Sequence, residues 1–140
     1  MIDIRLFRSD PEAIRRGLRN RSRSDTIVDR VVELDEGRRV LVTELDELRA
    51  EVNSASQEVG RRKKAGDDAE ELMERVRSLK DRIRELEERV AGVDADLEAA
   101  ILTIPNLPHQ STPVGSNETE NVPVRQGPPP RAMDFEPKPH

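Results

Sequence analysis

The chain has 140 residues with a formal net charge of −5; 38% of them are charged, 34% are hydrophobic and only two are aromatic, which excludes a wide globular core and favours a thin, elongated helical protein. The absence of cysteine excludes disulfide bonds and thiolate metal sites. No apolar run is long enough to cross a membrane or to form a secretory signal, so we expect a cytoplasmic location.

The first predicted element is a short helix over about residues 10–19. Ser9 or Asp10 can cap its start, and Pro11 suits its first turn because the missing backbone donor has no partner there in any case. Residues 1–24 carry seven arginines against three acidic residues. We therefore expect the chain to begin with a short helix in a strongly basic segment.

Two heptad patterns follow, and they predict long helices over about residues 26–60 and 67–104. Apolar residues recur in steps that alternate between three and four, the spacing of a coiled-coil seam. The seam positions are Ile27, Val31, Leu34, Arg38, Leu41, Leu45, Leu48, Val52, Ala55 and Val59, then Ala69, Leu72, Val76, Leu79, Ile83, Leu86, Val90, Val93, Leu97, Ala100 and Ile104. Two patterns of similar length joined by a short tip at 60–67 predict an antiparallel hairpin.

Arg38 is the one charged residue among these seam positions. A long arginine stem can lie along apolar neighbours while its guanidinium reaches out of the seam. We expect the stem of Arg38 to cross the layer of Val93 and the guanidinium to reach Asp35 or Asp94.

The two flanks of this hairpin differ in charge. On one, here named the Arg89 flank, glutamates of the first helix face arginines of the second, and the expected pairs are Glu58 with Arg75, Glu51 with Arg82 and Glu44 with Arg89. Such exposed pairs contribute only about 0.2–1 kcal/mol each, but they select register. On the other, the Lys80 flank, Arg49 is expected to face Lys80 with no acid between them. An RNA phosphate lying across that flank would relieve the repulsion.

The tip is a second basic island, because residues 60–64 carry four cations and no acid. Gly60 and Gly66 are expected to end the first helix and turn the chain. Cations grouped in this way bind phosphates, and the lack of aromatic residues in the hairpin excludes base stacking; a solubilising loop would have the same composition. The candidate RNA-binding residues are Arg49, Asn53, Ser56, Arg61, Arg62, Lys63, Lys64 and Lys80.

No catalytic or metal site is predicted. Both histidines, His109 and His140, lie in the proline-rich segment over residues 105–140, which holds all but one of the ten prolines. No catalytic partner lies near either histidine in the sequence. The glycines around the tip lack the Gly-Lys-Ser/Thr of a phosphate-binding loop. We expect an extended linker here, not an enzyme site.

Several motifs together resemble the amino-terminal region of bacterial seryl-tRNA synthetase. They are IDIRLFRSDPE near the start, IPNLPH after the second long helix, NETENVPVR beyond it and FEPKPH at the end. The resemblance implies a long antiparallel helical arm that grips the long variable arm of serine tRNA by backbone and shape contacts. It also implies that residues 105–140 are a linker to a catalytic domain that is not among the 140 residues.

The same resemblance implies a parent activity, the attachment of serine to tRNA with ATP and Mg²⁺ by a class II aminoacyl-tRNA synthetase that acts as a homodimer. The class II motifs are missing, so we expect this chain to be inactive alone and to hold no cofactor. The family usually has a basic residue at Val52 and often a lysine at Gln57, so individual RNA contacts are expected to differ here.

Two other functions stay open at this stage. One is a structural coiled-coil module that binds a protein helix through a second apolar stripe of Val28, Val32, Val40 and Val42. The other is a freestanding arm paralogue with no catalytic partner. Binding to serine tRNA that weakens steeply with salt would separate RNA binding from the structural module, because phosphate contacts release counterions.

Overall fold

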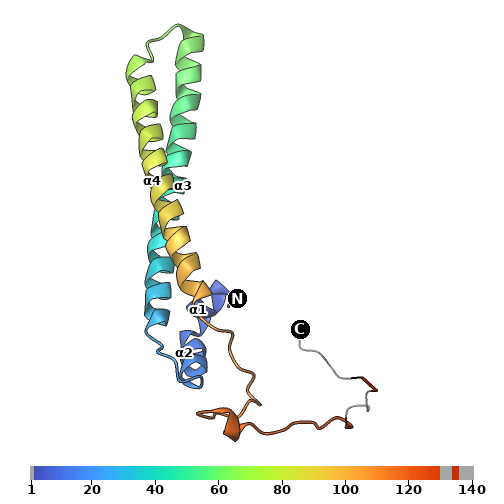
Figure 1. Ribbon diagram of the computed structural model, residues 1–140. Helices are drawn as coiled ribbons and strands as arrows, with labels where there is room; N and C mark the ends of the chain where they lie inside the picture. Colours follow the sequence, from blue (N-terminus) through green and yellow to red (C-terminus); the bar gives the residue numbers. More distant parts are fainter. Residues whose placement is uncertain (1, 130–133, 136–140) are drawn as a thin grey trace. The chain divides into compact units, whose positions relative to one another are not determined.

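The computed structural model describes residues 2–129 and 134–135 (Figure 1). In them it contains α1 (Ile4–Ser9), α2 (Pro11–Arg19), α3 (Ile27–Ala65), α4 (Glu70–Leu102) and the short 3₁₀-helix η1 (Glu118–Glu120). No strand occurs in these described ranges, which confirms the all-α prediction. The chain divides into one compact unit, Met1–Pro108, and a second, His109–His140, of which residues 130–133 and 136–140 lie outside the described part.

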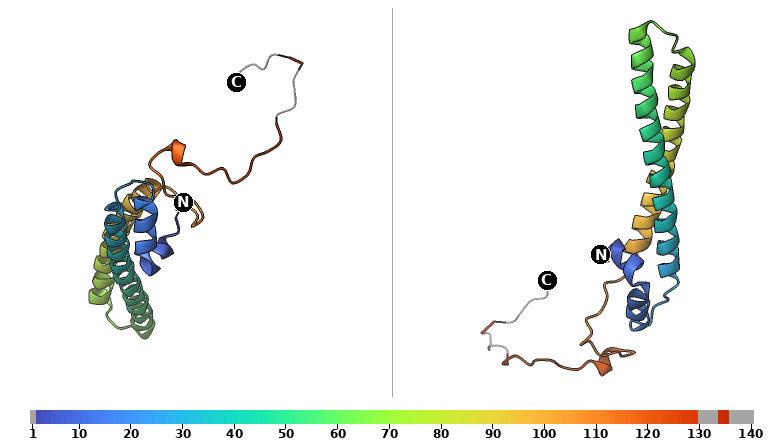
Figure 2. Two further views of the ribbon diagram at one scale, coloured as in Figure 1. Left: turned by 90° about the horizontal axis from the view of Figure 1, so that it is seen from below. Right: turned by 180° about the vertical axis from the view of Figure 1, so that it is seen from behind.

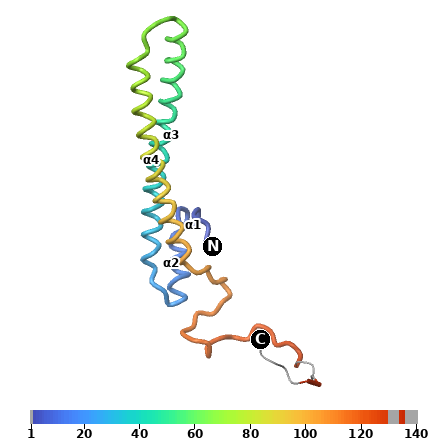
Figure 3. Tube along the Cα trace, turned by 45° about the horizontal axis from the view of Figure 1, so that its top comes forward, coloured from blue at the N-terminus to red at the C-terminus, as the bar shows by residue number. Residues whose placement is uncertain are grey.

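The first unit is built on a hairpin of α3 and α4, which run side by side in opposite directions in all views (Figures 1 to 3). The predicted hairpin is therefore confirmed. Midway along it, Leu41, Leu45 and Leu48 of α3 pack with Leu86 of α4 in one buried cluster. These are heptad positions, so burial of the two apolar seams holds the helices together.

The tip differs from the prediction, because α3 continues through Gly60 and ends only at Ala65. Gly66 ends the helix in a left-handed conformation with φ 80°, which glycine adopts without steric cost. Its N–H donates to the carbonyl oxygens of Arg62 and Lys63, and the N–H of Asp67 donates to that of Arg62 at 3.0 Å. The basic tip residues therefore lie in the last turns of a helix, not in a loop.

The N-terminal segment forms two helices, so the prediction of one helix over residues 10–19 missed α1. Asp3 starts α1 by accepting a hydrogen bond from the N–H of Arg5 at 2.8 Å. Asp10 ends α1 and caps α2, where its carboxylate accepts from the N–H of Ala13 at 2.9 Å. Two aspartate caps so close together make two short helices out of one segment.

α1 and α2 pack against the open end of the hairpin, which we call the base (Figure 2). The side chains of Phe7, Ile14, Leu18, Val28 and Val31 are at most 2% exposed there. Val28 belongs to this core, and Val32 packs partly buried against it. Val28 and Val32 are therefore not exposed, and the predicted apolar stripe for binding a protein helix is wrong at these two positions.

An ion pair ties α1 to α3 at the base. Asp35 is only 3% exposed, and Arg8 donates to its two carboxylate oxygens at 2.7 and 2.6 Å. These hydrogen bonds lower the pKa of Asp35 from its ordinary value, against the effect of burial. Arg38 forms its ion pair with Asp94 of α4, one of its two predicted partners, whereas the other, Asp35, pairs with Arg8.

The segment that leaves α4 packs back on α2. Gly17 is buried in α2, and a Cβ added to it would lie 2.5 Å from Cδ2 of Leu107. Only a residue without a side chain lets Leu107 sit this close. The base therefore holds the first part of the chain beyond the hairpin, up to Pro108.

Candidate nucleic-acid interface

A row of cations runs along one face of α4. Arg77, Lys80 and Arg84 are exposed and lie three and four residues apart, so they project from the same side of the helix. Lys80 makes no ion pair or hydrogen bond within the described part of the chain. Arg77 and Arg84 pair within the helix with Glu74 and Asp81, at 3.1 and 2.9 Å. All four of these side chains are at least 66% exposed, so water competes strongly with both pairs.

Sequence reasoning found Lys80 but missed Arg77 and Arg84. The signal was present in the spacing, because helical neighbours three and four residues away share a face. Arg77 and Arg84 do not lie at the positions directly beside the seam, on which the predicted RNA-binding flank was based.

The α3 side of the Lys80 flank is polar and exposed. Arg49, Asn53 and Ser56 lie four and three residues apart on one face of the helix. Ser56 lines a shallow notch of about 220 Å³ together with Met73 and Arg77 of α4. The notch brings the two helical rows together, so they form one continuous surface near the tip.

The expectation that Arg49 faces Lys80 without an acid is wrong. Arg49 donates from Nη2 to Oε1 of Glu87 on α4 at 2.8 Å, and its Nη1 lies 3.7 Å from Asp46. The two helices are thus bridged on this flank by opposite charges. Both the Arg49 and the Glu87 side chains are about half exposed, at 51% and 48%, so the pair holds Arg49 only weakly.

On the Arg89 flank the ion pairs form one heptad away from the expected partners. Arg75 bonds to Glu51 at 2.5 Å and Arg82 to Glu44 at 3.1 Å. All three predicted pairs are therefore wrong: Glu58 with Arg75, Glu51 with Arg82, and Glu44 with Arg89. Each glutamate stands between two arginines seven residues apart, and long side chains reach either one. Arg89 is exposed and has no ion pair in the part of the chain that the structure describes.

The four tip cations are all exposed. Arg61 and Arg62 lie 3.6 and 3.5 Å from Glu58 in the preceding turn. Lys63 and Lys64 have no ion pair among the described residues. Cations at this position also stabilise the C-terminal end of the α3 dipole, so their charge serves the helix as well as any bound anion.

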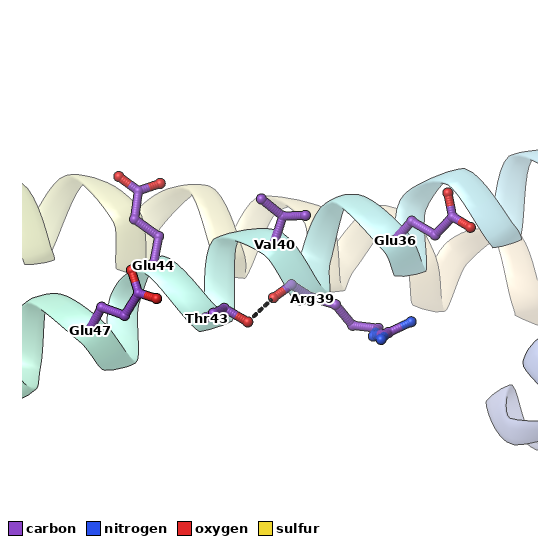
Figure 4. A pocket seen from close by; sticks show the side chains of 6 residues that line it. All are labelled: Glu36, Arg39, Val40, Thr43, Glu44 and Glu47. Carbon is purple, nitrogen blue, oxygen red and sulfur yellow. Dashed lines mark hydrogen bonds between the residues drawn. The ribbon is translucent and has the colours of Figure 1, made fainter.

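The outer face of α3 midway along the hairpin is acidic. Figure 4 shows six of its side chains: Val40 lies between Glu36 and Glu44 along the helix, Glu47 lies beyond Glu44, and the hydroxyl of Thr43 donates to the backbone carbonyl of Arg39 at 2.9 Å. The hollow of about 640 Å³ there is lined by α3 alone. A phosphate backbone would meet three carboxylates on this face, so the Lys80 flank suits it better.

In the described residues, no group of three His, Cys, Asp or Glu side chains is arranged to hold a metal ion. Nδ1 of His109 lies 2.8 Å from Oγ of Ser111, and the carbonyl of His109 accepts from the N–H of Thr112 at 2.9 Å, so both contacts are within its own turn. Across the same residues, no helix is apolar enough over a sufficient length to span a membrane.

Comparisons with known proteins agree on one family. The family model described as the seryl-tRNA synthetase N-terminal domain matches residues 1–108. The serine–tRNA ligase of Desulfitobacterium hafniense is 41% identical over 140 residues, which are 100% of this chain and 33% of that protein. That of Caldicellulosiruptor saccharolyticus is 45% identical with the same coverage. The chain thus spans about a third of the length of the curated relatives it matches.

Solved structures show the same likeness. The crystal structure of seryl-tRNA synthetase from Pyrococcus horikoshii complexed with ATP matches with a TM-score of 0.80 and 35% identity, over 89% of this chain and 28% of that one. Cytoplasmic serine–tRNA ligase from Naegleria fowleri in complex with AMP matches with a TM-score of 0.77 and 27% identity, over 89% of this chain and 34% of that one. The fold is therefore similar to one region of these larger proteins.

Proposed function

Because the chain belongs to the seryl-tRNA synthetase N-terminal domain family, we propose that its hairpin binds the long variable arm of serine tRNA by backbone and shape contacts. The observation that carries this proposal is the row of Arg77, Lys80 and Arg84 on α4, which continues toward the tip cations. Exposed cations in a row meet successive phosphates of a backbone. Without aromatic side chains the hairpin reads shape and charge and does not stack on bases.

The binding face in this proposal is the Lys80 flank together with the tip. Asn53 and Ser56 supply neutral hydrogen-bonding groups beside the cations. Arg49 joins them when a phosphate competes with Glu87 for its guanidinium, since that pair is half exposed. On the Arg89 flank, by contrast, Arg75 and Arg82 are each bridged to a glutamate of α3.

The proposal extends to the larger protein of which this chain corresponds to about a third. There, residues 105–140 lead from the arm to a catalytic domain that attaches serine to tRNA with ATP and Mg²⁺. That protein acts in the cytoplasm as a homodimer. The relatives named serine–tRNA ligase and the ATP complex of the Pyrococcus horikoshii protein support this wider assignment.

Charge reversal at two matched positions tests the binding face. Lys80 and Arg89 are both exposed cations of α4 without an ion pair in the described residues, and they lie on opposite flanks. We expect Lys80→Glu to weaken binding of serine tRNA about tenfold, and to reduce the slope of log K against log salt by about 1. Arg89→Glu changes the net charge equally and is expected to weaken binding about twofold at most.

The measurement is a titration of labelled serine tRNA at several salt concentrations, with the same tRNA lacking its variable arm as a control. Circular dichroism checks that both variants keep their helices. Equal loss from both variants would mean that only overall charge matters. A greater loss from Arg89→Glu would place the RNA on the other flank, and unchanged binding without the variable arm would remove that arm as the ligand.

A further inference from the structure

A second group of cations lies at the base, at the end of α2 far from the tip (Figure 1). Arg16 is on the outer face of α2, opposite the buried Ile14 and Leu18. Arg21 and Arg23 follow in the turn that leads to α3. All three are exposed, and none has an ion pair in the described residues. We call Arg16, Arg21 and Arg23 the base surface.

These arginines form no ion pair in the described residues because the acids near them are already engaged. Asp29 accepts from Arg15 at 2.5 Å, and Asp25 accepts from Arg19 at 2.6 Å. Glu12 pairs with both of these arginines, at 3.1 and 3.4 Å. Residues 10–30 hold six arginines against four acids, and three of the four arginines that have no ion pair in the described residues form the base surface.

Hydrogen bonds fix the backbone of the turn that carries two of them. The N–H of Arg23 donates to the carbonyl of Leu18, and the N–H of Ser22 donates to that of Arg19, both at 2.9 Å. Ser22 has φ 53°, so it is left-handed, a conformation that costs energy in any residue but glycine. The turn is therefore a defined helix end that holds Arg21 and Arg23 on either side of one residue.

We propose that the base surface is a second phosphate-binding surface for the same RNA, separate from the Lys80 flank. The proposal rests on the function proposed above. α3 rises about 58 Å along its 39 residues, with the base at one end and the tip at the other. A folded RNA held at both ends is fixed in position along the hairpin, whereas one held at the tip alone can pivot.

The test compares two double substitutions that each remove two exposed arginines with no ion pair in the described residues. Arg21→Gln with Arg23→Gln changes the base surface. Arg5→Gln with Arg30→Gln removes the same charge from α1 and from the first turn of α3. Binding of serine tRNA is measured as a function of salt, beside wild type and Lys80→Glu. A short RNA stem-loop, too short to span both surfaces, is the second probe.

We expect the base double variant to weaken binding of the whole tRNA about tenfold, and to reduce the salt slope by about 1.5 to 2. The matched control variant is expected to change the slope by less than about 0.5. The short stem-loop should bind the base variant and wild type equally. Thermal unfolding of each variant separates RNA binding from a role in stabilising the end of α2, which would lower the melting temperature and leave the salt slope unchanged.

Each outcome decides between the two proposals. If Lys80→Glu weakens binding and the base variant does not, the base surface does not bind RNA, and a protein partner becomes the alternative for it. The function proposed for the hairpin then stands. If the base variant weakens binding and Lys80→Glu does not, the base surface stands and the Lys80 flank is wrong. If wild type binds serine tRNA no better than an unrelated RNA, both are overturned.

Discussion

The base and the tip of the hairpin have the same kind of seam but bury it differently. At the base, α1 and α2 cover the open ends of α3 and α4, and Ile14, Val28 and Val31 are fully enclosed. Toward the tip only two helices remain, and seam residues such as Val59 and Val76 are only partly buried. With only two helices to cover them, these side chains in the outer half of the seam stay partly open to water.

Because of this difference, we expect the base to provide most of the stability and the tip to provide most of the RNA-binding surface. Buried apolar area is the main favourable term in folding, so most of the free energy of unfolding comes from the base. The tip has few buried contacts, and we expect its amides to exchange with solvent faster than those near Leu45. A thin, polar, weakly packed end is suited to entering a groove of a folded RNA, and the base supplies its anchor.

The largest expected effect comes from emptying the base core. Ile14→Ala should lower the free energy of unfolding by about 3 kcal/mol, within the range of about 2–5 kcal/mol for buried Ile or Leu. Val76→Ala, in the half-open seam near the tip, should lower it by about 1 kcal/mol or less. Urea unfolding measures both. Equal losses would show that base and tip contribute alike and would contradict the comparison.

The ion pair between α1 and α3 is expected to have the next largest effect. Asp35→Asn should lower the free energy of unfolding by about 1–2 kcal/mol, because it leaves Arg8 without a charged acceptor. The loss stays below the value of about 3–5 kcal/mol for fully buried pairs, since the Arg8 side chain is 43% exposed. If urea unfolding shows no measurable decrease in the free energy of unfolding, α1 is held by its apolar contacts alone.

The same pair predicts a dependence on pH. Arg8 holds the pKa of Asp35 below its ordinary value, so the folded state binds this proton less readily than the unfolded chain does. The stabilisation is complete above the unfolded carboxyl pKa of about 3.9 and is lost as the pH falls toward the lower folded pKa. Wild type and Asp35→Asn should therefore converge in stability below about pH 4. A constant difference from pH 7 to pH 2.5 would contradict this.

Two glycines sharpen the comparison because one is closely packed against another segment and the other has open space beside it. Gly17→Ala must displace Leu107 at the base and should lower stability by about 1 kcal/mol. Gly37→Ala meets no atom within 4 Å and should raise stability by about 0.5–1 kcal/mol, because alanine favours the helix. Thermal unfolding gives both signs. If Gly17→Ala also stabilises, the segment around Leu107 does not hold its place on α2.

The smallest expected effect is at Arg38, where the covered base gives way to the open seam. Its pair with Asp94 is 35% and 46% exposed and contributes little, whereas a leucine would complete the heptad. Arg38→Leu should therefore leave the free energy of unfolding unchanged or raise it by up to about 1 kcal/mol. A loss of more than about 2 kcal/mol would reveal an ionic network that the Arg38–Asp94 pair alone does not account for.

The sequence by itself determined the hairpin and the resemblance to its family. Heptad spacing identifies which residues are buried along two helices, because each apolar residue in the seam contributes a large and additive free energy. The same register limited the expected partner of Arg38 to Asp35 or Asp94, because both lie beside the layer that Arg38 forms with Val93. The structure decided for Asp94. Lys80 was found as a candidate because its neighbours across the seam follow from the register.

Only the tertiary structure decided the features that depend on weak or distant contacts. Arg49 pairs with Glu87, and Arg75 pairs with Glu51 instead of Glu58. Each exposed ion pair contributes little free energy, so the sequence cannot distinguish between two partners that lie one heptad apart. The burial of Asp35 against Arg8 joins residues 27 positions apart, which no local pattern records. The packing at the base depends on contacts among four helices, whereas the heptad spacing can be recognised in the sequence of each helix by itself.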